Sequence, residues 1–131
     1  MTDQKKILVI DDDPEILVLL KSHLEAENYE VMPCENGVRG IDLARTLSPD
    51  LIILDILLPD ISGLKMCRIL KGDKETKKIP ILILTALADK ETKIESFESE
   101  ADDFLVKPID KKVLISKINK SYGNNSKDVG R

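Results

Sequence analysis

Three short apolar runs rich in branched residues stand out in the chain, and each has the length of a β-strand. They span residues 6–11 (KILVID), 50–55 (DLIILD) and 79–85 (IPILILT). Unbroken apolar runs of this kind are typical of parallel strands that are covered on both faces. Two weaker segments, 29–34 (YEVMPC) and 103–108 (DFLVKP), also have strand-like lengths and are bounded by turn or helix-start residues. The pattern therefore predicts five strands.

Between these strands, apolar residues recur at intervals of three and four, which is the spacing of an amphipathic helix. The pattern predicts five helices. Their apolar positions are Ile16, Leu17, Leu20 and Leu24; Val38, Ile41, Ala44 and Leu47; Leu64, Cys67 and Leu70 or Lys71; Ile94 and Phe97; and Leu114, Ile115, Ile118 and Tyr122. The expected N-capping residues are Asp13, Asn36, Ser62, Asp89 and Asp110. Gly72 and Gly123 are expected to end the third and fifth helices.

Strict alternation of strand and helix requires crossover connections. It therefore predicts an α/β domain with one parallel sheet and helices on both faces. The length of 131 residues is that of a single domain, which we expect to span residues 1–122. Residues 123–131 (GNNSKDVGR) are polar and rich in small side chains, so we expect a disordered tail or the start of a linker there.

Composition narrows the class of partner. The formal net charge is −4, and the basic residues are interspersed among acidic ones, so no broad basic surface is expected for nucleic acid or anionic lipid. No apolar run approaches the roughly 20 residues of a membrane helix, and the start MTDQKK lacks the apolar stretch of a signal peptide. We therefore expect a cytoplasmic protein. Cys34 and Cys67 lack metal-ligand spacing and are expected to be reduced, buried thiols.

Acidic residues end two of the predicted strands. Asp11 and Asp12 end the first strand, and Asp55 ends the third. In an open parallel sheet, ligands bind outside the carboxyl ends of the strands, where the winding direction reverses. If the first and third strands are neighbours, three carboxylates converge there, and their mutual repulsion requires a cation. Oxygen ligands of this kind favour Mg²⁺ or Mn²⁺.

Two further strand ends complete a set of groups suited to phosphoryl transfer. Lys107, at the end of the fifth strand, would balance the acidic charge together with a divalent ion, and Thr85, at the end of the fourth, adds a hydroxyl donor. A carboxylate nucleophile, a cation, a lysine and a hydroxyl are what transfer of a phosphoryl group onto an aspartate needs. Taken singly, each residue has a simpler interpretation as a solvated strand end or a surface charge. The joint placement at four strand ends favours the functional interpretation.

The segments that carry these residues resemble the receiver domains of bacterial two-component systems. The matching segments are ILVIDDDPEI (7–16), PDLIILDILLPDISGL (49–64), IPILILTA (79–86) and ADDFLVKP (101–108). The resemblance implies a flavodoxin-like fold, with a single doubly wound five-stranded sheet in the order 2-1-3-4-5 and five helices. It also implies a phosphorylation-activated signalling switch, a response regulator and phosphoprotein rather than an enzyme.

The resemblance also implies a role for each site residue. Asp55 is expected to be the phospho-acceptor. Mg²⁺, or alternatively Mn²⁺, is expected to be bound by the side chains of Asp12 and Asp55 and by the backbone carbonyl of Leu57. Asp11 is expected to contribute through water.

Three further residues are expected to respond to the phosphoryl group. Lys107 pairs with the acceptor carboxylate or the phosphoryl group, and its peptide bond to Pro108 is expected to be cis, as in relatives. Thr85 hydrogen-bonds the phosphoryl oxygens. Phe104 is expected to rotate inward when Thr85 moves, with a fixed core ring as the alternative.

The expected partners also follow from the resemblance. The phosphoryl donor would be a sensor histidine kinase or a phosphotransfer protein. Phosphorylation would change the face made by the fourth helix, fifth strand and fifth helix, which binds an output partner or output domain. We expect no direct contact with nucleic acid or membrane. The sequence leaves open whether the chain acts alone or belongs to a longer protein.

The chain departs from the family pattern at several positions. Glu100 stands where relatives commonly have Gly, so the loop before the fifth strand is expected to differ in shape. Ile109 replaces an aromatic residue, and Ser62 replaces an Asp. Leu57 and Leu87 lie where polar side chains of some relatives orient the hydrolytic water, so we hypothesise slow self-dephosphorylation.

Two other functions compete with this interpretation. A pseudo-receiver, which docks without ever accepting a phosphoryl group, would share the fold but does not need the complete acidic set. A Mg²⁺-dependent aspartyl phosphatase of the haloacid-dehalogenase-like kind could use Asp11 and Asp13, but Glu15 stands where its hydroxyl residue is expected. A dinucleotide- or flavin-binding protein is disfavoured because no glycine-rich loop follows the first strand.

Overall fold

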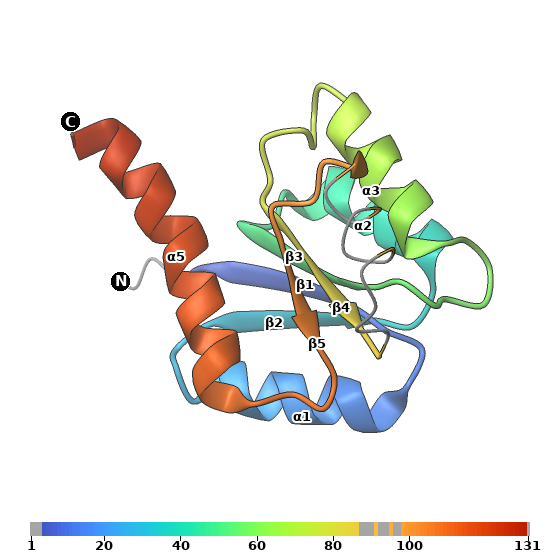
Figure 1. Ribbon diagram of the computed structural model, residues 1–131, viewed down its shortest axis with the longest axis horizontal. Helices are drawn as coiled ribbons and strands as arrows, with labels where there is room; N and C mark the ends of the chain where they lie inside the picture. The colour runs from blue at the N-terminus through green and yellow to red at the C-terminus, as the bar shows by residue number, and fades with distance from the viewer. Residues whose placement is uncertain (1–3, 87–90, 92–94, 96–97, 131) are drawn as a thin grey trace.

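The computed structural model describes residues 4–86, 91, 95 and 98–130 and contains one five-stranded parallel sheet (Figure 1). The strand order is β2-β1-β3-β4-β5, which confirms the expected doubly wound architecture. The elements are β1 (Lys6–Ile10), α1 (Pro14–Glu25), β2 (Glu30–Cys34), α2 (Gly37–Leu47), β3 (Leu51–Asp55), α3 (Gly63–Gly72), β4 (Ile81–Thr85), β5 (Asp103–Val106) and α5 (Lys111–Gly130). Among these helices, none is both long and apolar enough to cross a membrane.

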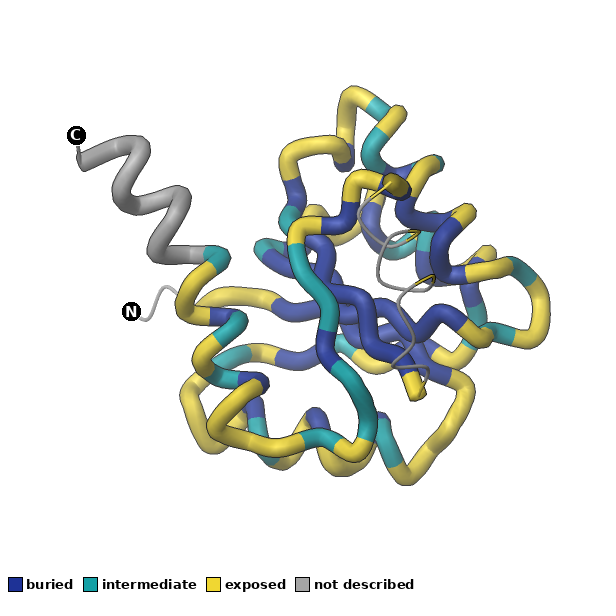
Figure 2. Tube along the Cα trace, in the orientation of Figure 1, coloured by how far each residue is buried: buried dark blue, intermediate teal, exposed yellow. Residues whose placement is uncertain are grey.

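Helices cover both faces of the sheet, which explains the unbroken apolar strands. α1 and α5 pack on one face and α2 and α3 on the other, and each face has its own apolar cluster. In β3 and β4 all five residues are buried, so the central strands form the blue interior of Figure 2. The outer strands β2 and β5 are only partly buried, as expected for sheet edges.

The register of the sheet brings the carboxyl ends of the strands to one edge. Ile10 pairs with Leu54, so the residue that follows β1 lies beside the last residue of β3. Thr85 pairs with Val106, so the residue that follows β5 lies beside the end of β4. The predicted site residues therefore share one edge because parallel strands align their ends.

Four of the expected helix caps are confirmed. In each case a side-chain oxygen accepts a hydrogen bond from a backbone N–H of the first helical turn, which has no partner inside the helix. These pairs are Asp13 with Glu15, Asn36 with Arg39, Ser62 with Leu64 and Asp110 with Val113. Asp89, Ile94 and Phe97, on which the prediction of the fourth helix rests, lie outside the described residues.

The prediction of the buried face of α2 was partly wrong. Val38 and Leu47 were expected to face the core, but they are 63% and 38% exposed. Ala44 is buried and Ile41 packs against the apolar cluster as expected, and the other buried residues are Gly37 and Gly40. A Cβ atom at Gly40 would lie 2.6 Å from the side chain of Ile10, so α2 lies too close to β1 for a larger side chain at this position.

The prediction that Gly123 ends the last helix was also wrong, because α5 runs from Lys111 to Gly130. Glycine within a helix costs only about 1 kcal/mol relative to alanine. It ends a helix efficiently when it adopts a left-handed conformation, and no glycine in the described part of the chain has a positive φ. The assignment of residues 1–122 to the domain and of 123–131 to a tail stays a prediction.

Glu100 adopts a backbone conformation that favours glycine. Its φ is 72°, in the left-handed region, and the expected difference in loop shape from relatives stays a prediction. We expect Glu100→Gly to stabilise the protein by about 1 kcal/mol, because the side chain makes this conformation costly. Urea unfolding measures the difference. The control Glu100→Ala removes the same side chain but keeps a Cβ atom, and an equal gain in both variants would contradict the explanation.

Candidate functional site

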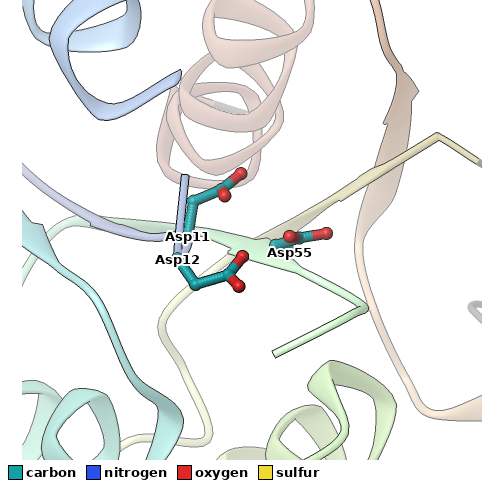
Figure 3. Close-up of side chains that lie close together, drawn as sticks. All are labelled: Asp11, Asp12 and Asp55. Atoms are coloured by element: carbon teal, nitrogen blue, oxygen red, sulfur yellow. The ribbon is translucent and has the colours of Figure 1, made fainter. Parts of the chain in front are cut away.

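Three carboxylates lie at the edge where β1 and β3 end (Figure 3). Asp11 and Asp12 follow β1, and Asp55 is the last residue of β3. One carboxylate oxygen from each lies within 4.8 Å of the other two. Asp11 and Asp55 are buried, whereas Asp12 is exposed. The structure thus brings together the three acidic residues that the sequence placed at one edge, with one side open to solvent.

Lys107 supplies a positive charge to this cluster. It follows β5, and its backbone N–H donates to the carbonyl of Thr85 at 2.7 Å, which carries the strand pairing one residue further. Its Nζ lies 3.0 Å from Asp11 Oδ2 and 3.6 Å from Asp55 Oδ2. Burial opposes protonation of Lys107, but its contacts with Asp11 and Asp55 outweigh this effect and raise its pKa. The cis peptide bond to Pro108 is present as expected.

Asp11 is fully buried, and its two oxygens have different environments. Oδ1 accepts a hydrogen bond from the backbone N–H of Asp13 at 2.9 Å. Oδ2 contacts Lys107 at ion-pair distance, but it accepts no hydrogen bond of ordinary geometry from any residue that the structure describes. A buried carboxylate oxygen without a hydrogen bond costs free energy, so this oxygen is suited to a hydrated cation.

The surroundings of Asp55 disfavour the ionised form of its carboxyl group. Its Oδ1 accepts a hydrogen bond from the backbone N–H of Leu57 at 3.2 Å. Burial is the main cause that raises its pKa, the charge of Asp11 adds to this, and the opposing effect of Lys107 leaves the pKa at about 6. Two of the three clustered carboxylates, those of Asp11 and Asp55, therefore share the ammonium group of Lys107, and the donor set of hard oxygens fits a divalent cation such as Mg²⁺. A cation there would stabilise the ionised form of Asp55.

Gly63, the first residue of α3, lets that helix start directly against the acceptor strand. A Cβ atom at Gly63 would collide with the carbonyl oxygen of Asp55 and would lie 2.7 Å from Cα of Ile56. The backbone N–H of Gly63 donates to the carbonyl of Ile56 at 2.8 Å. Sequence reasoning identified Ser62 as the cap but missed this role of Gly63. The glycine directly after the cap was the only signal in the sequence.

Thr85 and Phe104 occupy the places expected from the sequence. Thr85 is buried at the end of β4. Phe104 is half-buried in β5 and packs against the apolar cluster beneath α2 and α3. Lys117 Nζ lies 5.5 Å from the ring centroid of Phe104 and 3.1 Å from Asp103 Oδ1. The roles of Thr85 and Phe104 in switching stay predictions.

Comparisons with known proteins agree with this geometry. Residues 7–119 match the family model of the response regulator receiver domain. The DNA-binding transcriptional regulator RpaA of Synechocystis is 43% identical over 113 residues, which cover 86% of this chain and 47% of RpaA. Protein PilH of Pseudomonas aeruginosa is 36% identical over 114 residues, which cover 87% of this chain and 94% of PilH. The chain thus spans about half of the first relative and nearly all of the second.

The fold also matches that of a solved structure. The CheY-like receiver domain protein from Methanospirillum hungatei superposes with a TM-score of 0.89 at 28% identity, and the match covers 96% of this chain and 99% of that chain. The family match, the sheet order and the acidic edge therefore lead to one conclusion. The chain belongs to the response regulator receiver domains, the phosphorylation-dependent signalling switches of two-component systems.

Proposed function

We propose that Asp55 accepts a phosphoryl group from a sensor histidine kinase or a phosphotransfer protein. The observation that carries this proposal is the convergence of Asp11, Asp12 and Asp55 beside Lys107. Asp12, Asp55 and the backbone carbonyl of Leu57 would hold Mg²⁺, or Mn²⁺ in its place, with Asp11 acting through water. The bound ion would neutralise charge on the incoming phosphoryl group.

The chemistry is a direct transfer between two side chains. A carboxylate oxygen of Asp55 attacks the phosphorus of a phosphohistidine on the donor. The new O–P bond forms an acyl phosphate as the N–P bond breaks, and the imidazole of the donor leaves with the electron pair. Lys107 lies where its ammonium group can stabilise negative charge on the phosphoryl oxygens.

The switch would start from the new negative charge on Asp55. Phosphorylation places a group with about two negative charges at neutral pH on Asp55, by analogy with phosphoserine, where the ionised carboxylate carried one. Thr85 and Lys107, at the ends of β4 and β5, are the donors we expect to respond, with Phe104 following Thr85. Their movement would alter the face of β5 and α5 together with the expected fourth helix, where an output partner or output domain would bind.

Intact-mass analysis after incubation with a small phosphodonor tests the acceptor. We expect one added phosphoryl group in the parent chain, in the presence of Mg²⁺ and not in its absence. Asp55→Ala should remain unmodified, whereas the control Asp42→Asn, which changes an exposed carboxylate of α2, should be modified like the parent. No adduct on the parent, under conditions that modify a known receiver, would instead support the pseudo-receiver.

Leu57 is the basis of a prediction about the lifetime of the acyl phosphate. Leu57 is 58% exposed and lies two residues after Asp55, where an apolar group cannot orient a hydrolytic water. We expect slow loss of the phosphoryl group from the parent and loss several-fold faster from Leu57→Asn, followed by intact mass over time. Leu19→Asn, a similar change on the surface of α1, is the control. A lifetime of seconds for the parent would contradict the prediction.

A further inference from the structure

The loop between β3 and α3 is fastened to the start of α2 by one side chain, Asp60. Asp60 Oδ1 accepts a hydrogen bond from the backbone N–H of Gly37 and Oδ2 from that of Val38, both at 2.9 Å. These are the first two N–H groups of α2, which have no partner inside the helix. The two oxygens of one carboxylate thus connect the loop to a second element.

The same loop carries groups that the proposed function needs. It follows Asp55 directly and includes Leu57, whose carbonyl is an expected metal ligand. Leu57 is exposed and lies only three residues before Asp60. A restraint at Asp60 therefore limits how far the carbonyl of Leu57 can move.

An apolar contact reinforces this connection. A Cβ atom at Gly37 would collide with Cγ2 of Ile61 and would lie 2.7 Å from the sulfur of Met66. The residue after Asp60 therefore packs directly against the backbone of α2, in the space that a side chain would otherwise fill. Two consecutive loop residues thus contact the first turn of the helix, one through hydrogen bonds and one through packing.

The capping of α2 does not depend on Asp60. Asn36 caps the same helix by accepting a hydrogen bond from Arg39 N–H at 2.9 Å. The hydrogen bonds from Val38 and Gly37 hold the pKa of Asp60 below its usual range, so its carboxylate is ionised at neutral pH. Asp60 is exposed, yet each of its oxygens accepts a backbone hydrogen bond, which distinguishes it from a solvated surface charge.

We infer that Asp60 is a positioning residue for the phosphorylation site: by fixing the β3–α3 loop to α2, it holds the carbonyl of Leu57 where the metal ion needs it. Among the residues that the structure describes, the side chain of Asp60 bonds to α2 and not to the reacting groups. The inference rests on the proposed function, because it concerns the metal ion that the proposal assigns to this edge.

The test compares Mg²⁺ binding in Asp60→Ala with binding in Asn36→Ala. Both variants remove hydrogen bonds from the first turn of α2, but only the first releases the loop. We expect the Kd for Mg²⁺, measured by isothermal titration calorimetry, to rise about tenfold in Asp60→Ala, the lower range for loss of a group that orients a metal ligand. Asn36→Ala should keep the parent value. Asp60→Asn, which keeps one acceptor oxygen, should lie between them.

A second readout follows the loop itself. The backbone amide resonance of Leu57 in metal-free protein should shift in Asp60→Ala and Asp60→Asn but not in Asn36→Ala. Parent-like Mg²⁺ affinity in both Asp60 variants, or equal weakening in Asn36→Ala, would overturn the inference and leave the proposed function intact. A parent chain that binds no Mg²⁺ would overturn both. If Asp60→Ala does not fold, the comparison of Asp60→Asn with Asn36→Ala decides.

Discussion

Replacing Gly63 by alanine is expected to destabilise the protein by about 3 kcal/mol, the upper range for overpacking of a tightly packed site. The added Cβ would collide with the carbonyl oxygen of Asp55 and approach the carbonyl carbon of Asp55 to 2.9 Å. These are backbone atoms, which cannot rotate away as a side chain can. Either α3 or the end of β3 must move, so phosphorylation of Asp55 should slow as well.

Urea unfolding of Gly63→Ala and Gly72→Ala measures this effect. Gly72 is the last residue of α3, and a Cβ atom there would meet nothing within 4 Å. Gly72→Ala should therefore be neutral or stabilising by up to about 1 kcal/mol, from the higher helix propensity of alanine. An unfolding midpoint of Gly63→Ala equal to that of the parent would show that the β3–α3 junction can adjust without cost.

Replacing Lys107 by methionine is expected to destabilise the metal-free protein at pH 7.5 by about 3 kcal/mol, as when one partner of a buried ion pair is removed. Methionine keeps much of the apolar stem but leaves Asp11 and Asp55 without their shared counter-ion. Mg²⁺ should recover part of the lost stability, and so should a second change, Asp55→Asn. The control Lys111→Met breaks a solvent-exposed pair with Glu27, so a loss below about 0.5 kcal/mol is expected.

The pH dependence of this loss has a definite sign. The pKa of Asp55 is raised from 3.8 to about 6 in the folded parent, and removing the opposing charge of Lys107 raises it further. A carboxyl group with a raised pKa destabilises the folded state fully above that pKa, and the penalty is relieved as pH falls toward the unfolded value. The stability gap between Lys107→Met and the parent should therefore narrow between pH 7.5 and pH 5. A constant gap would mean that lost packing, and not charge, causes the destabilisation.

The features that local pattern controls could be predicted from the sequence. Asp11, Asp55 and Thr85 were placed at strand ends because buried parallel strands are continuous apolar runs with abrupt polar ends. Lys107 was placed at the end of a weaker segment, which Pro108 bounds. The neighbour relation of β1 and β3 came from the resemblance and not from the pattern, because strand order depends on packing between segments distant in sequence. That order in turn decided whether the carboxylates would meet.

The wrong and missed predictions concern close contacts and backbone geometry, which the periodicity of the sequence does not encode. The inward face of α2 was partly misjudged because its apolar positions Val38 and Leu47 fit a helical period, whereas the close approach of the helix to Ile10 is made at Gly40. The contacts of Gly63 and Asp60 were missed because they depend on the path of the β3–α3 loop, which no periodicity encodes. Gly123 did not end α5, because glycine ends a helix reliably only with suitable backbone geometry.

Lys107 lies closer to Asp11 than to Asp55, and this difference has a thermodynamic consequence. Its ammonium group lies 3.0 Å from Asp11 and 3.6 Å from Asp55. A phosphoryl group on Asp55 that attracts this ammonium group would therefore move it away from Asp11. Asp11 is then left with negative charge that a metal ion can compensate. Phosphorylation of Asp55 and binding of the cation should therefore be positively cooperative. Thermodynamic linkage makes this coupling reciprocal. One lysine between two aspartates would thus let phosphorylation favour metal binding, and metal binding favour phosphorylation.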